Sequence, residues 1–271
     1  MSGIRSVTLA TDNLNQTIEL FHHTLGLNYK KHHGAIQFGD GNISPGTRIQ
    51  FVEIPQGLSE PYRHFDSIGL RTPSNEGLEH YAEILNDAHI SFSEPSLLNG
   101  HAYFEFTDDT QQTFSIFSNE HNSGVGLGMP YEDSSVNPLH QIQGLGPIVI
   151  KTNELMVTFS MLTQVFGFTP LGEYTKDHDD NKVVVLHLDE GGLGTEVHLY
   201  TPSSPIKFPE VGIVEQIEFT ARDEQHLNTA IKQLELNELP YQQLKNEQDK
   251  TRAIRINDVS GMSFILTLDE S

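Results

Sequence analysis

Apolar and polar positions follow the same order twice along the chain. Residues 3–9 form a short apolar run that begins at a glycine, and residues 144–150 repeat this run. Each run leads through a polar break into apolar positions spaced three and four residues apart, the pattern of an amphipathic helix. The helical stripes are Leu14, Ile18, Phe21 and Leu25 in the first copy and Leu155, Phe159, Leu162 and Phe166 in the second. The pattern therefore predicts an internal duplication.

The elements after each helix also recur in order. Two predicted strands flank a glycine-rich loop at 39–46, and their counterparts flank the loop at 189–194. Each copy then continues with a strand, a second amphipathic helix and closing strands. Matched positions are about 141 residues apart at the first strand and about 150 at the last, so the spacing between the two copies changes little along the chain. The predicted fold class is α+β, with two tandem β-α-β-β-β modules, each with an extra helix and strands, that form curved mixed sheets with pseudo-two-fold symmetry.

Composition marks a boundary between the two copies. Residues 119–142 are rich in Gly, Asn, Ser, Pro and acidic residues, which is typical of a surface linker. We therefore expect a first module at 1–120, a linker at 121–142 and a second module at 143–271. The glycines of 124–128 lie in the linker with no Rossmann-type strand ahead of them, so flexible chain is favoured there over a nucleotide-binding loop.

Charge and residue usage narrow the classes of partner. The 271 residues include 37 Asp and Glu against 16 Lys and Arg, which gives a strongly acidic protein with a formal net charge of −21. This charge repels phosphate backbones and anionic lipid, so neither nucleic acid nor a membrane is expected as a partner. Neither a membrane-spanning run nor a signal peptide is indicated, which favours a cytoplasmic location. The chain has no cysteine, so any metal would need histidine or carboxylate ligands.

Several short motifs resemble those of a known superfamily. They are Gly-Ile-x-x-Val-Thr-Leu at 3–9, Leu-Gly-Leu at 25–27, Phe-Gly-Asp at 38–40 with Pro-Gly-Thr at 45–47, Gly-Gly at 191–192 with Gly-Thr at 194–195, and the ending at 255–266. Together they resemble the vicinal oxygen chelate superfamily of glyoxalases, bleomycin-resistance proteins and extradiol dioxygenases. The nearest likeness is to two-module dioxygenases that cleave hydroquinone and catechol rings. The resemblance implies that each sheet bends into a cup able to hold a divalent metal and a substrate with two vicinal oxygens.

The resemblance also implies three metal ligands, but other residue types stand at those positions. The dioxygenases use a His in the first strand, a His in the strand before the last helix and a Glu in the last strand. The corresponding residues here are Ser6, Gln216 and Ile265. The pseudo-symmetric cup would use Ser67, Ser115 and Pro147, which are no better as ligands. Because such side chains do not hold Fe(II) against water, we expect no metal cofactor.

A relocated metal site is the alternative. His187 and His198 lie near mirror positions across the 189–196 hairpin, so they could be neighbours on one face. Glu218 lies two residues after Gln216, on the same face of its strand. Two imidazoles and a carboxylate would suit Fe(II), Mn(II) or zinc if they converged. Otherwise the two histidines form an ordinary cross-strand pair.

Two functions of different class follow from the sequence. The first is a metal-independent protein that binds a small aromatic or quinone-like molecule in its cup. The candidate cup residues are Ser6, His187, His198, Gln216, Glu218 and Arg255. The second is an enzyme with no assigned catalytic residue, either an extradiol-type dioxygenase with a relocated Fe(II) or Mn(II) site or a metal-free lyase or isomerase. A third hypothesis is that side chains fill the cup and that the acidic surface binds a protein partner. The sequence does not decide whether the chain forms a homo-oligomer.

Overall fold

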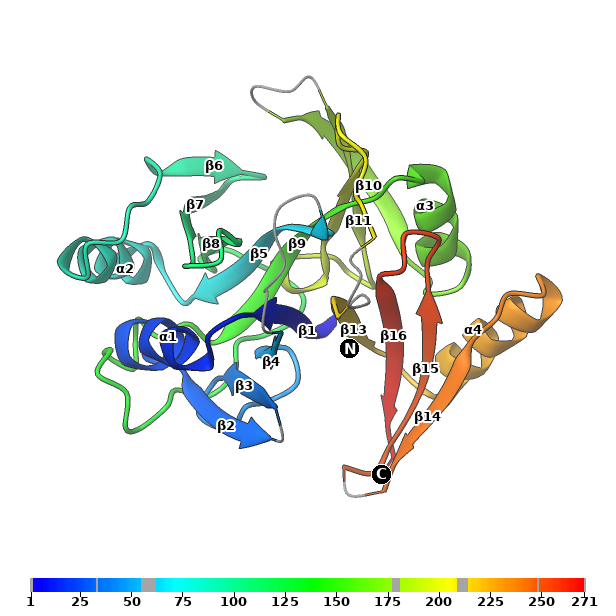
Figure 1. The fold of residues 1–271 in the computed structure, drawn as a ribbon, viewed down its shortest axis with the longest axis horizontal. Helices are drawn as coiled ribbons and strands as arrows, with labels where there is room; N and C mark the ends of the chain where they lie inside the picture. The colour runs from blue at the N-terminus through cyan, green and yellow to red at the C-terminus, as the bar shows by residue number, and fades with distance from the viewer. Residues whose placement is uncertain are drawn as a thin grey trace.

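Four successive β-α-β-β-β units make up the part of the chain that the computed structural model describes, which is residues 2–32, 34–54, 62–176, 181–208, 214–247 and 249–270. Figure 1 shows their arrangement. The first unit contains β1 (Ile4–Thr11), α1 (Leu14–Ile18) with its π-helical continuation η1 (Glu19–Thr24), β2 (Asn28–His32), β3 (Ala35–Gly39) and β4 (Arg48–Glu53). The second contains β5 (Phe65–Thr72), α2 (Asn75–Asp87), β6 (Ser96–Leu98), β7 (His101–Thr107) and β8 (Thr113–Ser118).

The second half of the chain repeats this order. The third unit contains β9 (Gly144–Lys151), α3 (Leu155–Gln164), β10 (Thr169–Thr175), β11 (Lys182–His187), the short turn η3 (Leu193–Thr195) and β12 (Val197–Tyr200). The fourth contains β13 (Gln216–Thr220), α4 (Glu224–Leu236), β14 (Gln242–Asn246), β15 (Thr251–Asn257) and β16 (Ser263–Asp269). Among the described residues, no helix combines the length and apolar character needed to cross a membrane.

Each sheet combines one unit from the first half of the chain with one unit from the second half. Sheet A has the strand order β14-β15-β16-β13-β1-β4-β3-β2, so it joins the fourth unit to the first. Sheet B has the order β10-β11-β12-β9-β5-β8-β7-β6, so it joins the third unit to the second. The antiparallel pairs β1–β13 and β5–β9 form the two seams. The predicted α+β class with two curved mixed sheets is confirmed, but each sheet takes strands from both predicted modules.

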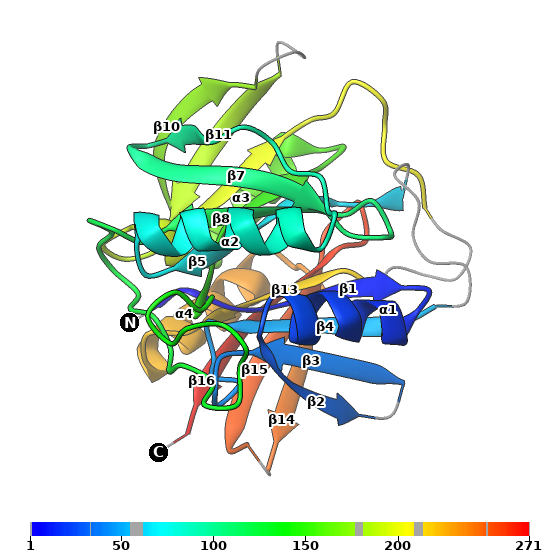
Figure 2. The ribbon, with the colours of Figure 1, turned by 90° about the vertical axis from the view of Figure 1, so that its left-hand side faces the viewer.

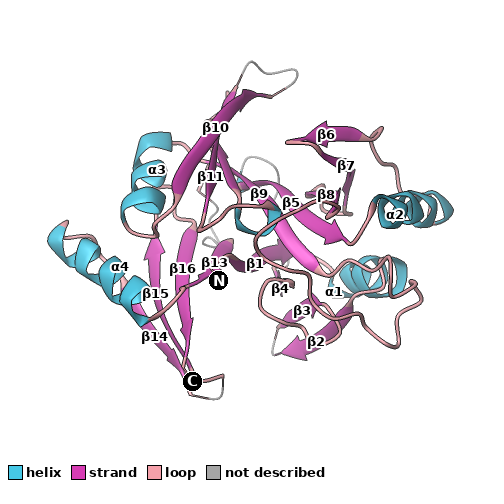
Figure 3. Cartoon of the chain, turned by 180° about the vertical axis from the view of Figure 1, so that it is seen from behind, coloured by secondary structure: helices cyan, strands magenta, loops and turns pink. Residues whose placement is uncertain are grey.

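The helices pair the units differently from the sheets. Helices α1 and α2 lie together on one side of the strands, as Figure 2 shows, and α3 and α4 lie on the opposite side (Figure 3). The ring of Phe21 contacts Phe114 of β8 with centroids 5.1 Å apart, and Phe166 contacts Phe219 of β13 at 5.8 Å. Apolar packing therefore joins the units within each predicted module, whereas backbone hydrogen bonds join the modules to each other.

The segment between β8 and β9 has no regular secondary structure, and most of its residues are half-buried or exposed, but parts of it are held against the fold. Val136 within it is 2% exposed. The fully buried guanidinium of Arg71 donates to the carbonyl oxygens of Val125 and Gly126 at 2.9 and 3.4 Å, and to that of Leu145 at 2.8 Å. A buried cation therefore binds two backbone carbonyls of the glycine-rich stretch within the predicted linker.

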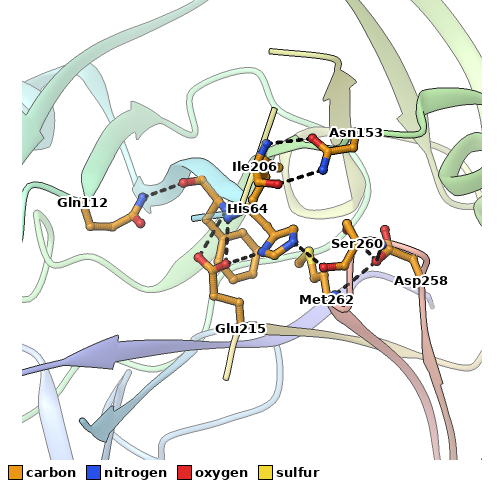
Figure 4. Close-up of polar contacts among 9 residues, drawn as sticks. His64, Gln112, Asn153, Ile206, Glu215, Asp258, Ser260 and Met262 are labelled. Carbon is orange, nitrogen blue, oxygen red and sulfur yellow. Dashed lines mark hydrogen bonds and ion pairs between the residues drawn. The ribbon is translucent and has the colours of Figure 1, made fainter. Parts of the chain in front are cut away.

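A buried ion pair connects the chain ahead of β5 with the chain ahead of β13 (Figure 4). His64 and Glu215 are 0% and 1% exposed. One oxygen of Glu215 accepts hydrogen bonds from the Nδ1 and the backbone N–H of His64, both at 2.7 Å. The Nε2 of His64 lies 3.1 Å from the carbonyl oxygen of Ser260, between β15 and β16. Both ring nitrogens face oxygen acceptors, an arrangement that favours the imidazolium form, in line with the raised pKa of His64 beside Glu215.

Candidate functional site

The concave face of sheet A carries the three positions at which the resemblance implies metal ligands. A cavity of about 260 Å³ opens there, which we call cup A. It is lined by Ser6, Thr8, Gln37, Gln50, Gln216, Glu218, Leu244, Lys245, Asn246, Thr251, Ala253, Ile265 and Thr267. Ser6 on β1 and Ile265 on β16 both pair with Glu218 on the strand between them, β13. The fold therefore brings Ser6, Gln216 and Ile265 together around Glu218.

The carboxylate of Glu218 already has donors on both oxygens. Ser6 Oγ donates to Oε2 at 2.7 Å, and the hydroxyl of Thr267 donates to Oε1. The Nε of Arg5 lies 3.3 Å from the same Oε1. Arg5 is 4% exposed, and although burial lowers its pKa, the hydrogen bond to Asp269 and the charge of Glu218 raise it overall. Arg5 therefore provides a permanent positive charge beside this carboxylate.

A ferrous or manganous ion does not fit the donor set of cup A. Such ions prefer imidazole and carboxylate ligands with open positions for substrate. The three implied positions offer a hydroxyl, an amide and an aliphatic chain, and the oxygens of Glu218 are occupied by protein donors. Throughout the described ranges, no group of three or more His, Asp or Glu side chains is placed to hold a metal.

The residues of the relocated site do not converge. Glu218 belongs to sheet A, whereas His187 and His198 belong to β11 and β12 of sheet B. The two histidines are not opposite each other either, because His198 pairs with Val185. The loop between β11 and β12 contains the turn η3. The strand pairing that results is offset by two residues from the one that would place His187 opposite His198.

Arg255 lies on the concave side of sheet A but outside the cavity lining. It pairs with Ile265 across β15 and β16. Its guanidinium donates to Ser263 Oγ from Nε at 3.0 Å and from Nη2 at 2.8 Å. The nearby hydroxyl therefore holds the Arg255 side chain, and of the six predicted cup residues only Ser6, Gln216 and Glu218 line cup A.

The concave face of sheet B forms a larger cavity of about 800 Å³, which we call cup B. The pseudo-symmetric positions Ser67, Ser115 and Pro147 line it. Its walls also include Asp66, Ser93, Glu94, Pro95, Ser96, Leu97, Leu98, Tyr103, Glu105, Phe117, Val149, Tyr174, Thr175 and Lys176.

The aromatic residues of cup B were not predicted from the sequence. Tyr103 on β7 and Phe117 on β8 stack with ring centroids 4.8 Å apart and planes 12° apart. Tyr103 and Glu105 stand two residues apart, as do Ser115 and Phe117, so alternation places each pair on one strand face. The sequence thus indicates which residues share a strand face, but only the pairing of β7 with β8 in the structure joins the two pairs into one wall.

His198 does not line cup B, but it contacts Tyr174 of the wall as part of a hydrogen-bonded chain. The imidazole is 0% exposed, with Nδ1 3.2 Å from the hydroxyl of Tyr174 and Nε2 3.2 Å from the carboxylate of Glu196. Burial, followed by the nearby Tyr103 phenol and the carboxylates around it, raises the pKa of Tyr174. Tyr174 is therefore a neutral phenol at physiological pH, held in place by the imidazole.

Comparisons with known proteins agree with this architecture. No family model matches the chain. The chain is 28% identical over 240 residues to the putative ring-cleaving dioxygenase MhqA of Bacillus subtilis (strain 168). The aligned region covers 84% of this chain and 74% of that protein.

Solved structures share the fold over nearly the whole chain. The crystal structure of a putative dioxygenase from Bacillus subtilis subsp. subtilis str. 168 matches with a TM-score of 0.75 and 17% identity, covering 99% of this chain and 86% of that one. Glyoxalase I from Zea mays matches with a TM-score of 0.63 and 12% identity, covering 99% and 93%. The resemblance seen in the sequence motifs is thus confirmed: this chain is similar in sequence to a putative ring-cleaving dioxygenase and shares the two-module fold of that protein and of glyoxalase I.

Proposed function

We propose that this member of the glyoxalase and ring-cleaving dioxygenase group binds a small aromatic or quinone-like molecule in cup A without a metal ion. One observation carries the proposal. The cavity is present at the positions of the implied ligands, but Ser6, Gln216 and Ile265 stand there, and protein donors occupy the oxygens of Glu218. A cup that retains its space without metal-binding groups supports binding rather than oxygen activation.

The lining of cup A suits the oxygens of such a ligand. Three amides, from Gln37, Gln50 and Gln216, line the cavity together with the hydroxyls of Ser6 and Thr8. An amide both donates and accepts hydrogen bonds, so it can bind a phenol O–H or a quinone carbonyl. An apolar protein cavity of about 150 Å³ accommodates benzene. The space of about 260 Å³ in cup A therefore admits a single substituted ring.

Metal analysis of the purified protein tests the metal-free state. We expect protein from iron- and manganese-supplemented medium to hold far less than one metal ion per chain. The triple variant Ser6→His/Gln216→His/Ile265→Glu is expected to approach one ion per chain, because it places two imidazoles and a carboxylate on adjacent strands of cup A. Elemental analysis by mass spectrometry measures both. Stoichiometric metal in the wild type that disappears in His187→Ala/His198→Ala would instead support a relocated enzyme site.

Calorimetric titration with hydroquinone and benzoquinone, in the presence of a chelator, tests ligand binding. We expect saturable binding that Gln216→Leu weakens about tenfold, since the leucine leaves a ligand oxygen without its hydrogen bond. Gln243→Leu is the matched control, because Gln243 is exposed on β14 and does not line cup A. Binding that appears only after iron is added would contradict the proposal.

A further inference from the structure

We propose that cup B is a second binding site, independent of the function assigned to cup A, which takes a neutral or positively charged planar aromatic molecule and discriminates against aromatic carboxylates. The two cups lie on different sheets and share no lining residue. The residues at the implied metal-ligand positions belong to cup A, so ligand binding in cup B does not depend on them.

The shape and surface of cup B favour a planar ring. Tyr103 and Phe117 form a stacked pair in its wall, and Tyr174 contributes a third ring from β10. Val149 and Pro147 add apolar surface. Aromatic rings gain from offset-stacked and edge contacts beyond simple burial. With a volume of about 800 Å³, the cavity lies within the usual range for small-molecule sites.

The polar groups in the wall are fixed before any ligand arrives. The chain from Glu196 through His198 holds the hydroxyl of Tyr174, with both contacts at 3.2 Å. On the other side, Ser115 Oγ donates to Glu105 Oε1 at 3.1 Å, and Ser115 is itself hydrogen-bonded to Ser67. Binding groups that are already held lose less conformational entropy when a ligand binds.

The charges around the cavity determine which ligands it accepts. Asp66, Glu94 and Glu105 line it, against one cation, Lys176. The Lys176 ammonium forms an ion pair with Asp66. Burial raises the pKa of Glu105 although the Ser115 hydrogen bond and the Lys176 charge oppose this, so its carboxylate is under-solvated. An N–H or O–H donor on the ligand would relieve that desolvation, whereas a ligand carboxylate would add a like charge.

Three ring compounds that differ only in one substituent provide the test. The probes are 4-hydroxybenzylamine, 4-hydroxybenzyl alcohol and 4-hydroxybenzoate, titrated calorimetrically into the full-length protein. We expect the amine to bind at least about tenfold more tightly than the benzoate, because a charge-assisted hydrogen bond to Glu105 replaces a repulsion. The alcohol is expected to lie between them.

Variants locate the binding within cup B. Glu105→Gln is expected to abolish most of the preference for the amine while keeping affinity for the alcohol. Glu173→Gln is the matched control, because Glu173 is an exposed carboxylate on β10 outside the cavity lining. Tyr103→Leu is expected to weaken all three probes, and Tyr103→Phe to preserve them, since only the leucine removes the ring. Circular dichroism and thermal melts establish that each variant is folded.

Three results would overturn the proposal. The first is equal or tighter binding of the benzoate, and the second is the absence of saturable binding by any probe at millimolar concentration. The third is loss of amine binding in Gln216→Leu but not in Tyr103→Leu, which would place the probe in cup A. If cup A alone fails to bind its ligand while cup B behaves as described, the inference about cup B stands.

Discussion

Replacing Glu215 with glutamine is expected to lower the free energy of unfolding by about 3–5 kcal/mol, the usual effect of removing one partner of a buried ion pair. The carboxylate receives hydrogen bonds from the ring and backbone of His64, and it lies 3.4 Å from the backbone nitrogen of Phe65. At 0% exposure, the His64 imidazolium cannot turn to water when its partner is neutralised. The pair ties β5 of sheet B to β13 of sheet A, so its loss weakens the contact between the sheets (Figure 4).

Urea unfolding followed by circular dichroism measures this change. Glu224→Gln is the control, because Glu224 is 68% exposed and its pairing with Arg252 at 2.9 Å is screened by solvent. We expect that control to change stability by less than about 1 kcal/mol. An equal loss in the two variants would show that the buried pair has no special role.

The stabilisation by this pair is also expected to depend on pH. Burial lowers the pKa of His64, but the hydrogen bond and charge of Glu215, aided by Asp258, raise it overall. The contribution is fully present below the unfolded-state pKa of histidine, about 6.5, and is lost as the pH rises through the raised folded-state value. The stability difference between wild type and Glu215→Gln should therefore shrink on the alkaline side. A difference that stays constant from about pH 6 to about pH 9 would contradict an imidazolium at His64.

Replacing Arg71 with methionine is expected to lower the free energy of unfolding by about 3 kcal/mol or more, because several buried acceptors lose their donor together. The guanidinium donates to the carbonyl oxygens of Leu145 and Val125 and to the side-chain oxygen of Asn119, at 2.8 to 2.9 Å. Burial lowers the pKa of Arg71 to about 10, so the group remains charged at neutral pH. Methionine fills much of the space but satisfies none of these oxygens.

Arg71→Lys tests whether charge alone suffices. Lysine has no planar fork, so it cannot reach the separated acceptors at once, and we expect an intermediate loss of stability. The site is also shaped for the fork, since a Cβ added at Gly144 or Gly194 would lie 2.7 or 2.8 Å from Nη2 of Arg71. Arg222→Met is the control, because Arg222 is 59% exposed. Full stability in Arg71→Lys, measured by urea unfolding, would mean that the fork is not needed.

Local pattern was sufficient for the order of elements and for the residues on the floor of cup A. Helical stripes and glycine-rich turns depend on neighbouring residues, so the β-α-β-β-β order could be predicted from the sequence. The same alternation placed Gln216 and Glu218 on one strand face, and both line cup A in the structure. Motif resemblance supplied Ser6 and Ile265, which pair with Glu218 from the two neighbouring strands.

Only the tertiary structure decided which strands share a sheet. Alternation marks the two faces of a strand but does not specify its partner, because that choice depends on packing between residues far apart in sequence. The β1–β13 and β5–β9 seams therefore went unpredicted, as did the β11–β12 register that separates His187 from His198. Cup B depends on the same long-range choices, since the β7–β8 pairing and the curvature of sheet B bring its rings and carboxylates around one cavity.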